Sequence, residues 1–453
     1  MTNKFIFKIR SFFLSGSELS IKVKKNVVGL IFIKGYSLII SFLLVPITLE
    51  ILGSYKYGIW ITIFNILAMI QILDIGIGNG LRNMLTSSNA TNNINKAKEY
   101  VSTAYIMLGF ISLLLCALFI IPWNYIDWAG VFNTDNSLKN EIKELIGITF
   151  VLTLMSFFLN LINIILTSYH KPALSSLIFA FSNTIVLALF LIFKVSLKEN
   201  LIVIGLIYSA VPIIVLVVAS ILLFSRNYYL IRPSFRYFKR ERINELLSLG
   251  SKFFIIQISI LIIFQTDSLI ISHFLDPSEV TPYSIVYKYF SIISTVVTII
   301  LTPFWAAYSH ANEKKDFLWI KNILVKQFKS FILVIVLIFL MLIVSKPVIS
   351  LWLGNNLSIS LSLIISMAIF TLINVWNIAI GTFLNGINRI KVQLICSVIG
   401  LIINIPLSIY LIKEYGVTGV IIATSMSLLF FSIFGAREVL KVLKEHNNFL
   451  LNR

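Results

Sequence analysis

The stretch LIVIGLIYSAVPIIVLVVASILLF, Leu201–Phe224, runs through 24 positions without a charged residue. A helix of that length rises about 36 Å, enough to cross the hydrocarbon core of a bilayer. The rest of the chain has the same character, because 58% of its 453 residues are hydrophobic and only 12% are charged. A soluble domain carries about 25% charged residues, so the sequence predicts a membrane protein whose solvent is lipid.

Apolar runs of this kind recur along the chain. They predict an all-α integral membrane protein with about 12 transmembrane helices in two pseudo-symmetric six-helix bundles. The predicted spans are Val27–Ile51, Ile59–Leu81, Val101–Ile121, Leu145–Leu166, Ala173–Phe193, Leu201–Phe224, Phe253–Leu275, Tyr283–Ala307, Phe328–Val344, Leu361–Leu384, Val392–Ile412 and Val417–Phe434.

Lysine and arginine fall mainly in alternate loops, which predicts cytoplasmic N- and C-termini by the positive-inside rule. The lysines left for the outer side are Lys56, Lys139, Lys143, Lys194, Lys198, Lys346 and Lys413. Lys8 and Arg10 interrupt the apolar stretch Phe5–Leu14, which favours an amphipathic lead-in over a signal peptide. The predicted organisation is an N-terminal tail (1–25), a first bundle (26–224), a basic linker with an amphipathic surface helix (225–247), a second bundle (248–436) and a basic tail (437–453).

Composition and loop length exclude several function classes. The net charge of +18 resides in short loops between spans, so we expect no nucleic-acid partner. Cys116 and Cys396 lie inside apolar spans, and the histidines show no ligand spacing. We therefore predict no catalytic residue, metal site or cofactor. No loop is long enough for a nucleotide-binding or glycosyltransferase domain.

The two halves of the chain resemble each other at a shift near 220 residues. AKEY (97–100) precedes the third span and KKDF (314–317) precedes the ninth. The pair Asn160 and Asn163 matches Asn374 and Asn377, and the cations Lys171 and Arg389 follow at the cytoplasmic turns. Six spans per copy give two parallel repeats around a central cleft, which is transporter architecture.

Four charges lie inside predicted spans, where each costs about 2.5–3.5 kcal/mol on insertion scales. Lys34 and Asp74 have similar depths, as do Asp267 and Lys288, so each pair is predicted to form an ion pair or to belong to a cargo or ion site. Glu50 is predicted to pair with Lys56 or to face the cleft.

The segment DIGIGNGLRN (74–83) has glycines at 76, 78 and 80. It follows no strand, so a nucleotide-binding fingerprint is rejected. The glycines instead favour close helix packing or a loosened span end. Arg82 then lies at the cytoplasmic mouth, as a head-group contact or an ordinary positive-inside anchor.

Three motifs, ILGSYKYGIW (51–60), DIGIGNGLRN (74–83) and AKEYVSTAY (97–105), resemble the oligosaccharide flippases of the multidrug/oligosaccharidyl-lipid/polysaccharide exporter superfamily. The resemblance implies flipping of a polyprenyl-diphosphate-linked oligosaccharide across a bacterial inner membrane for O-antigen, lipopolysaccharide or other surface polysaccharide. The implied partners are this substrate, the phospholipid bilayer, polysaccharide polymerase machinery and a coupling H⁺ or Na⁺. The second half departs from the motif, since Asp276-Pro277 replaces Leu52-Gly53 and DIGIGNG does not recur.

We assign candidate roles on this basis. The diphosphate is assigned to Lys34, Arg82, Lys288, Arg389 and Lys171; pairing or ion coupling to Asp74, Asp267 and Glu50; and the sugar lining to Asn160, Asn163, Asn374, Asn377 and Trp376. The alternatives are a cation-coupled multidrug exporter of the same superfamily and a membrane glycan polymerase or ligase. The in-span charges balance, which does not favour the exporter, and the longest outer loop is short for the polymerase.

Overall fold

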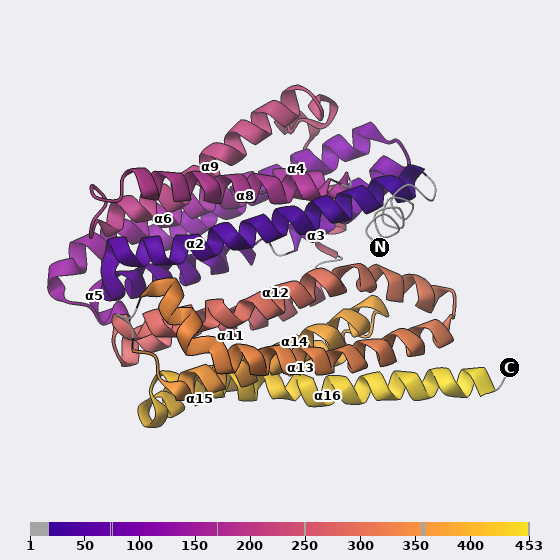
Figure 1. Cartoon of the computed structure of the whole chain (residues 1–453). Helices are drawn as coiled ribbons and strands as arrows, with labels where there is room; N and C mark the ends of the chain where they lie inside the picture. The colour runs from indigo at the N-terminus through magenta and orange to yellow at the C-terminus, as the bar shows by residue number, and fades with distance from the viewer. Residues whose placement is uncertain are drawn as a thin grey trace, which may run out of the picture. The chain divides into compact units, whose positions relative to one another are not determined.

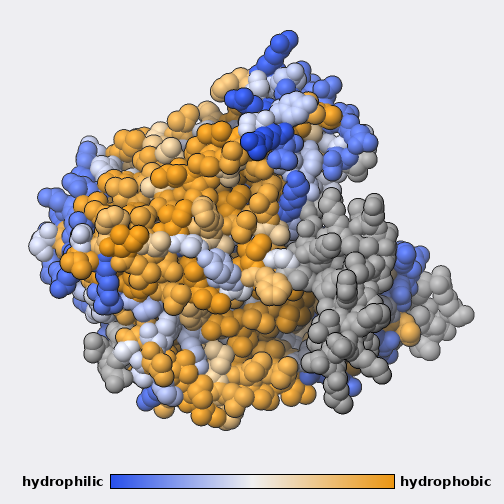
Figure 2. Space-filling view, turned by 45° about the horizontal axis from the view of Figure 1, so that its top comes forward, coloured by the Kyte–Doolittle hydropathy of each residue, from blue (hydrophilic) through white to orange (hydrophobic). Residues whose placement is uncertain are grey.

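The computed structural model describes residues 18–72, 74, 76–169, 171–248, 251–354 and 358–451. These residues form α-helices and short 3-10 turns, and no β-strand occurs among them. Eleven of the helices are long and apolar enough to cross a membrane. Figure 2 shows one face, on which apolar side chains form a broad surface with polar residues at its margins. The predicted all-α membrane fold is confirmed, and the predicted lead-in Phe5–Leu14 lies outside the described residues.

The helices cluster into two compact units (Figure 1). The first comprises Met1–Ile51, Leu73–Ile126 and Lys143–Ser251, and the second comprises Leu52–Ile72, Asp127–Ile142 and Lys252–Arg453. The elements mainly in the first are α2 (Glu18–Ala68), α3 (Ile77–Ala90), α4 (Ile94–Ile120), α6 (Lys139–Leu159), α7 (Leu161–Ser168), α8 (Pro172–Ile192), α9 (Leu201–Ser225), η3 (Tyr229–Ile231), η4 (Phe235–Tyr237) and α10 (Glu241–Ser248). Those in the second are η1 (Met69–Ile72), α5 (Trp128–Phe132), η2 (Asn136–Leu138), α11 (Ser251–Phe274), α12 (Pro277–Glu313), α13 (Phe317–Leu353), α14 (Leu361–Gly386), α15 (Lys391–Tyr415) and α16 (Val417–Leu451).

The units interleave along the chain. Within the second unit, the Asn65 amide nitrogen donates to Ser268 Oγ at 2.8 Å, and Ser272 Oγ donates to the Phe132 carbonyl at 2.7 Å. Both bonds tie segments from the first half of the sequence to α11. The linear bundle boundaries at 26–224 and 248–436 stay a prediction.

The first membrane-length helix contains two predicted spans. It runs from Gly29 to Ala68, 40 residues, or about 60 Å of helix and twice the thickness of the hydrocarbon core. Its backbone leaves helical geometry at Gly53, with φ 70° and ψ 169°. Positive φ suits glycine because it has no Cβ, so Gly53 ends one helical arm and begins the next.

Neighbouring contacts show that the chain reverses after this point. Gly29 lies beside Ala173 at the start of α8, and Glu50 pairs with Lys194 beyond its end, so the first arm runs parallel to α8. The last turns of α3 then return to the carbonyl of Ser168, just before α8 begins. The eleven helices therefore make about twelve crossings, as predicted.

The duplication is visible in the backbone. Positive φ at a non-glycine residue is uncommon, and here it marks the loops between helices. Three of these positions have a counterpart with positive φ in the second half, about 220 residues later. One counterpart is again a non-glycine residue, and the other two are glycines. The pairs are Asn92 with Lys315, Asn133 with Gly354, and Glu199 with Gly416.

The N-terminal caps of α4 and α13 show where the corresponding helices of the two halves begin. Asn93 caps α4 and Asp316 caps α13, each accepting a hydrogen bond from a backbone N–H three residues on. This places AKEY inside α4, whereas KKDF covers the turn before α13. The two motifs therefore do not occupy equivalent positions, which corrects their predicted match.

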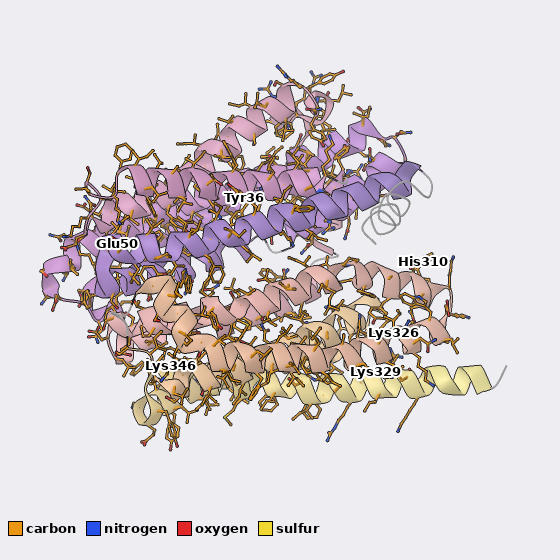
Figure 3. All side chains as sticks on the ribbon, viewed as in Figure 1. Tyr36, Glu50, His310, Lys326, Lys329 and Lys346 are labelled. Atoms are coloured by element: carbon orange, nitrogen blue, oxygen red, sulfur yellow. The ribbon has the colours of Figure 1, made fainter. Side chains whose placement is uncertain are left out.

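The ninth predicted span, Phe328–Val344, is the core of a longer helix. The observed helix, α13, has 37 residues. Lys329 and Lys346 are both exposed and lie toward opposite ends of α13 (Figure 3). They are separated by about 26 Å along the axis, which lets both ammonium groups reach polar surroundings while the apolar residues between them face lipid.

The linker is helical only at its end. After α9, the chain makes the short turns η3 and η4, and α10 alone forms the predicted amphipathic helix. Arg242 on α10 donates to Glu99 Oε2 at 2.9 Å and to Glu245 Oε1 at 2.6 Å. The Tyr100 hydroxyl also donates to Glu245, and this bond is the main reason that the pKa of Glu245 is lowered. Charge-assisted bonds thus fasten α10 to α4.

Gly80 on α3 tests how α10 is docked. A Cβ at this position would lie 2.0 Å from the Leu246 carbonyl oxygen, whereas a Cβ at Gly35 meets no atom within 4 Å. We expect Gly80→Ala to lower the melting temperature of the purified protein and to raise protease cleavage of the 225–248 linker. Gly35→Ala is the matched control and should leave both unchanged. Equal melting temperatures for the two variants would contradict this packing.

Candidate functional site

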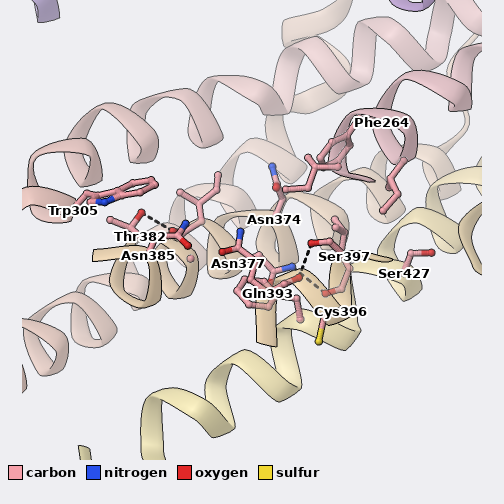
Figure 4. Close-up of a pocket in the computed structure, with 16 residues that line it drawn as sticks. Phe264, Trp305, Asn374, Asn377, Thr382, Asn385, Gln393, Cys396, Ser397 and Ser427 are labelled. Atoms are coloured by element: carbon pink, nitrogen blue, oxygen red, sulfur yellow. Dashed lines mark hydrogen bonds between the residues drawn. The ribbon is translucent and has the colours of Figure 1, made fainter. Parts of the chain in front are cut away.

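A cavity of about 240 Å³ lies within the second unit, between α11, α12, α14, α15 and α16 (Figure 4). Its lining combines neutral polar groups with aromatic rings, and none of the described residues that line it carries a charge. The polar residues are Asn374, Asn377, Thr382, Asn385, Gln393, Ser397 and Ser427, and the aromatic residues are Phe264, Trp305 and Phe431. This mixture can bind a neutral, hydroxyl-rich molecule.

Asn374 and Asn377 line the cavity, and both amides also hold helices together. The Asn374 nitrogen donates to Ser294 Oγ at 3.3 Å and so links α14 to α12. The Asn377 nitrogen donates to the Leu428 carbonyl at 3.0 Å, while its oxygen accepts from Ser432 at 2.7 Å. Asn377 therefore clamps α14 to α16.

Asn160 and Asn163, the equivalents in the first half, make different contacts. The Asn163 nitrogen donates to Asn160 Oδ1 at 2.8 Å, and the pair sits at the break between α6 and α7. This pair bonds locally, whereas Asn374 and Asn377 reach neighbouring helices. The repeat thus preserved the residues and changed their contacts.

Trp376 lies away from the cavity. Its ring packs against Phe328 and Phe331 of α13, and its Nε1 donates to the Ser432 carbonyl at 3.3 Å. The aromatic rings that do border the cavity are Phe264 of α11, Trp305 of α12 and Phe431 of α16. Trp376 therefore does not belong to the lining predicted for it.

Asp267 is completely buried in α11, without the predicted ion pair to Lys288. Its carboxylate accepts hydrogen bonds from the Tyr283 hydroxyl at 2.9 Å and from the Thr424 hydroxyl at 3.0 and 3.1 Å. Thr424 in turn accepts from the Asn404 amide nitrogen at 3.2 Å. The sequence could not foresee this, because the partners come from α12, α15 and α16.

The Asp267 cluster and the cavity share four helices, α11, α12, α15 and α16. Asp267 lies one turn beyond Ile263 and Phe264, and Thr424 lies one turn from Ser427. Gly400 separates the two regions, where a Cβ would come within 3.1 Å of the Ser427 carbonyl. Asp267 and its bonding partners therefore lie on helices that also form the cavity wall.

Asp74 also lacks its predicted ion partner, Lys34. Its carboxylate oxygens accept from the backbone N–H groups of Gly76 (2.9 Å) and Gly78 (2.8 Å), at the start of α3. The first N–H groups of a helix have no partner within the helix, so Asp74 satisfies donors that would otherwise be left unbonded. The predicted span Ile59–Leu81 is thus two helices with a break, which corrects the prediction.

The glycines beside Asp74 explain this break. Gly76 has φ 82°, a left-handed conformation that favours glycine. A Cβ at Gly78 would lie 2.6 Å from Asp74 Oδ2 and 2.7 Å from Ile164. The prediction that these glycines permit close packing and a loosened span end is confirmed.

The cations predicted to bind the head group differ in their contacts. Lys34 is half-buried and Arg82 is exposed, and neither has a side-chain ion pair among the residues that the structure describes. Lys171 lies over the Tyr228 ring, 5.4 Å from its centroid. Arg389 bonds Glu445 at 2.8 Å and Glu438 at 3.5 Å, so carboxylates already engage it.

Two further predicted residues lie elsewhere. Lys288 is half-buried on α12. Glu50 pairs with Lys194 rather than with Lys56, whose partner is Glu141 at 3.2 Å. Both ion pairs are partly exposed, so they contribute little to stability.

Several polar residues were missed by the sequence reasoning. Asn385, Gln393, Asn404 and Thr424 all lie in apolar helices and carry no charge. A search for charged residues inside spans passes over them. An amide deep in a predicted span was the signal that could have identified Asn404, whereas Asn385 and Gln393 lie at the edges of the predicted spans. No group of three or more His, Cys, Asp or Glu side chains in the described ranges is arranged to hold a metal ion.

A family model described as polysaccharide biosynthesis protein matches residues 23–306, more than half of the chain. The chain belongs to this family. A second family model, MatE, matches residues 253–410. The predicted recognition is confirmed.

Two similar proteins align with most of the chain. A candidate O-antigen export protein of Yersinia pseudotuberculosis is 25% identical over 78% of this chain and 81% of its own length. A candidate O-antigen transporter of Salmonella typhi is 22% identical over 84% of this chain and 88% of its own length. The role in surface-polysaccharide export that the sequence resemblance implies agrees with the names of these relatives.

Solved structures share the fold at low identity. An inward-facing multidrug resistance MATE family transporter of the MOP superfamily has a TM-score of 0.75 and 12% identity, covering 90% of this chain and 96% of its own. A MOP superfamily transporter from Pyrococcus furiosus has a TM-score of 0.66 and 14% identity, covering 93% and 97%. The family, the relatives and the fold identify a membrane transporter of the MOP superfamily.

Asp74 and Lys34 can be distinguished by mutation. If Asp74 serves the backbone of α3, Asp74→Ala should lower stability by about 1 kcal/mol, as the loss of a helix cap does. Asp74→Asn, which keeps one acceptor oxygen, should recover part of that loss. Lys34→Ala should not reproduce it. Thermal unfolding of the three purified variants provides the measurement. Equal losses of stability for Asp74→Ala and Lys34→Ala would instead support the predicted ion pair between these two residues.

Proposed function

We propose that this transporter flips a polyprenyl-diphosphate-linked oligosaccharide repeat unit from the cytoplasmic to the periplasmic leaflet of a bacterial inner membrane. The match to the polysaccharide biosynthesis family over residues 23–306 carries this proposal. The O-antigen relatives and the neutral polar cavity in the second unit agree with it. The cargo serves surface polysaccharide synthesis, with the polymerase machinery as a downstream partner.

The substrate has three chemically distinct parts, and the chain offers a suitable environment for each. The diphosphate is anionic, and Lys34 and Arg82 are predicted cations that have no side-chain ion pair among the described residues. The sugars need neutral donors and acceptors, which line the cavity. The polyprenyl tail can stay in the bilayer against the exposed apolar surface. Alternating access of two like-oriented bundles then moves the polar part across.

Asp267 is the proposed coupling group. A carboxylate buried in a helix bundle is costly when ionised, and its bonding partners Tyr283 and Thr424 supply hydroxyls rather than charge. Binding of a proton or Na⁺ offsets that cost. The Asn404 Oδ1 atom nearby is buried without a hydrogen-bond partner in the described structure, so oxygen ligands for a hard cation are present.

A complementation experiment tests the cargo. In a strain that lacks this protein, lipid-linked repeat units should accumulate inside and surface polysaccharide should disappear, with drug susceptibility unchanged. The wild-type gene should restore the polymer. Lys34→Gln and Arg82→Gln should each reduce export about tenfold, because a charge-assisted bond contributes about 1.5–3 kcal/mol.

The alternatives give different outcomes in that strain. Restored drug resistance without restored polymer would identify the multidrug exporter. Normal repeat-unit flipping with loss of chain elongation would identify the polymerase or ligase. Lys329→Gln changes an exposed lysine within α13; it is the control and should export normally.

Asp267 is tested separately in proteoliposomes with an imposed H⁺ or Na⁺ gradient. Asp267→Asn should remove the dependence of translocation on the gradient because the uncharged amide has no need of a counter-ion. Thr424→Val removes a hydroxyl donor and should shift the pH or Na⁺ dependence, whereas Thr424→Ser retains it. Unchanged gradient dependence in well-folded Asp267→Asn would exclude the coupling role.

A further inference from the structure

Two residues that line the cavity carry an amide oxygen without a hydrogen-bond partner in the described structure. These oxygens are Asn385 Oδ1 on α14 and Gln393 Oε1 on α15, and both atoms are buried. A buried acceptor without a partner costs about 1–3 kcal/mol. Two such atoms at one cavity indicate that a molecule with hydroxyl or N–H donors completes the site.

The chemistry of the lining restricts that molecule. Phosphate and carboxylate groups are acceptors at neutral pH, so they cannot satisfy two amide oxygens. The described lining also has no lysine or arginine to offset a negative charge. An anionic group entering this cavity would lose its hydration without compensation. The site therefore selects against acidic sugars and against the diphosphate.

The size and shape of the cavity point to a single ring. Its volume of about 240 Å³ is below the range of about 300–1,000 Å³ typical of drug-sized ligands. Trp305 and Phe264 supply aromatic surface on two sides, and amides and hydroxyls alternate with aliphatic side chains over the rest of the lining (Figure 4). A pyranose has a matching form, with apolar C–H faces and a rim of hydroxyl donors.

We propose that this cavity is a subsite for one uncharged sugar residue of the cargo, with Asn385 and Gln393 as hydroxyl acceptors and Trp305 and Phe264 as stacking surfaces. This inference rests on the proposed function, because it assigns one part of that cargo. The diphosphate then binds elsewhere, and the second unit selects the sugar.

The chain contains its own reporter for this cavity. Cys396 lines it, and Cys116 is the other cysteine. In a Cys116→Ser background, the rate at which a small neutral thiol reagent modifies Cys396 measures access to the cavity. The probes are methyl glycosides of glucose, galactose, mannose and N-acetylglucosamine, with methyl glucuronide as the anionic comparison.

At least one neutral glycoside should slow the modification of Cys396 severalfold, and methyl glucuronide should not. Gln393→Leu should weaken that protection about three- to tenfold, the effect of losing one neutral hydrogen bond. Gln327→Leu is the matched control, since Gln327 also has an unbonded buried amide atom but lies outside the cavity. It should leave protection unchanged, and thermal unfolding verifies that both variants fold.

The outcomes separate this inference from the proposed function. If no neutral glycoside protects Cys396, or if the glucuronide protects equally, the subsite is refuted even when complementation restores the polymer. If glycosides protect but complementation fails, the cavity binds sugar and the flippase proposal is wrong. If Gln393→Leu and Gln327→Leu behave alike, the role of Gln393 is refuted.

Discussion

The absence of water inside a bilayer is the constraint on which the rest of this structure depends. Backbone groups in the hydrocarbon must find partners within the protein, which is why the described spans are helical. A break is tolerated only where something replaces the missing bonds. At Asp74 a carboxylate does so by accepting from two glycine N–H groups. An acidic residue that looked like an ion-pair partner is thus part of the helix architecture.

The duplicated halves satisfy this constraint in different ways. Loop conformations and helix caps recur about 220 residues apart, so the scaffold was retained. The break in the second span has no counterpart in α12, which is continuous over 37 residues. The cations at equivalent turns also differ, since Lys171 lies over a tyrosine ring and Arg389 is held by two glutamates. Duplication fixed the fold, and divergence of contacts allowed each half its own task.

In the second unit, buried polarity is concentrated along a few helices. The uncharged cavity and the Asp267 cluster share α11, α12, α15 and α16, with Gly400 at the close approach of α15 and α16. Close-packed interiors transmit small shifts between neighbouring side chains. This arrangement gives a proposed sugar subsite and a proposed coupling carboxylate a direct mechanical connection, without any charge inside the cavity itself.

The sequence by itself determined the membrane class, the approximate span count, the duplication and the need for glycine at positions 76, 78 and 80. These follow from hydrophobic run length, residue spacing and backbone sterics, which are local properties of the chain. The tertiary structure alone decided which groups meet. Asp267 contacts Tyr283 and Thr424, Glu50 contacts Lys194, and Trp376 turns away from the cavity that Asn374 lines. Depth in a span places two charges at one level of the membrane, but the rotation of each helix about its axis sets their partners, and packing against distant helices determines that rotation.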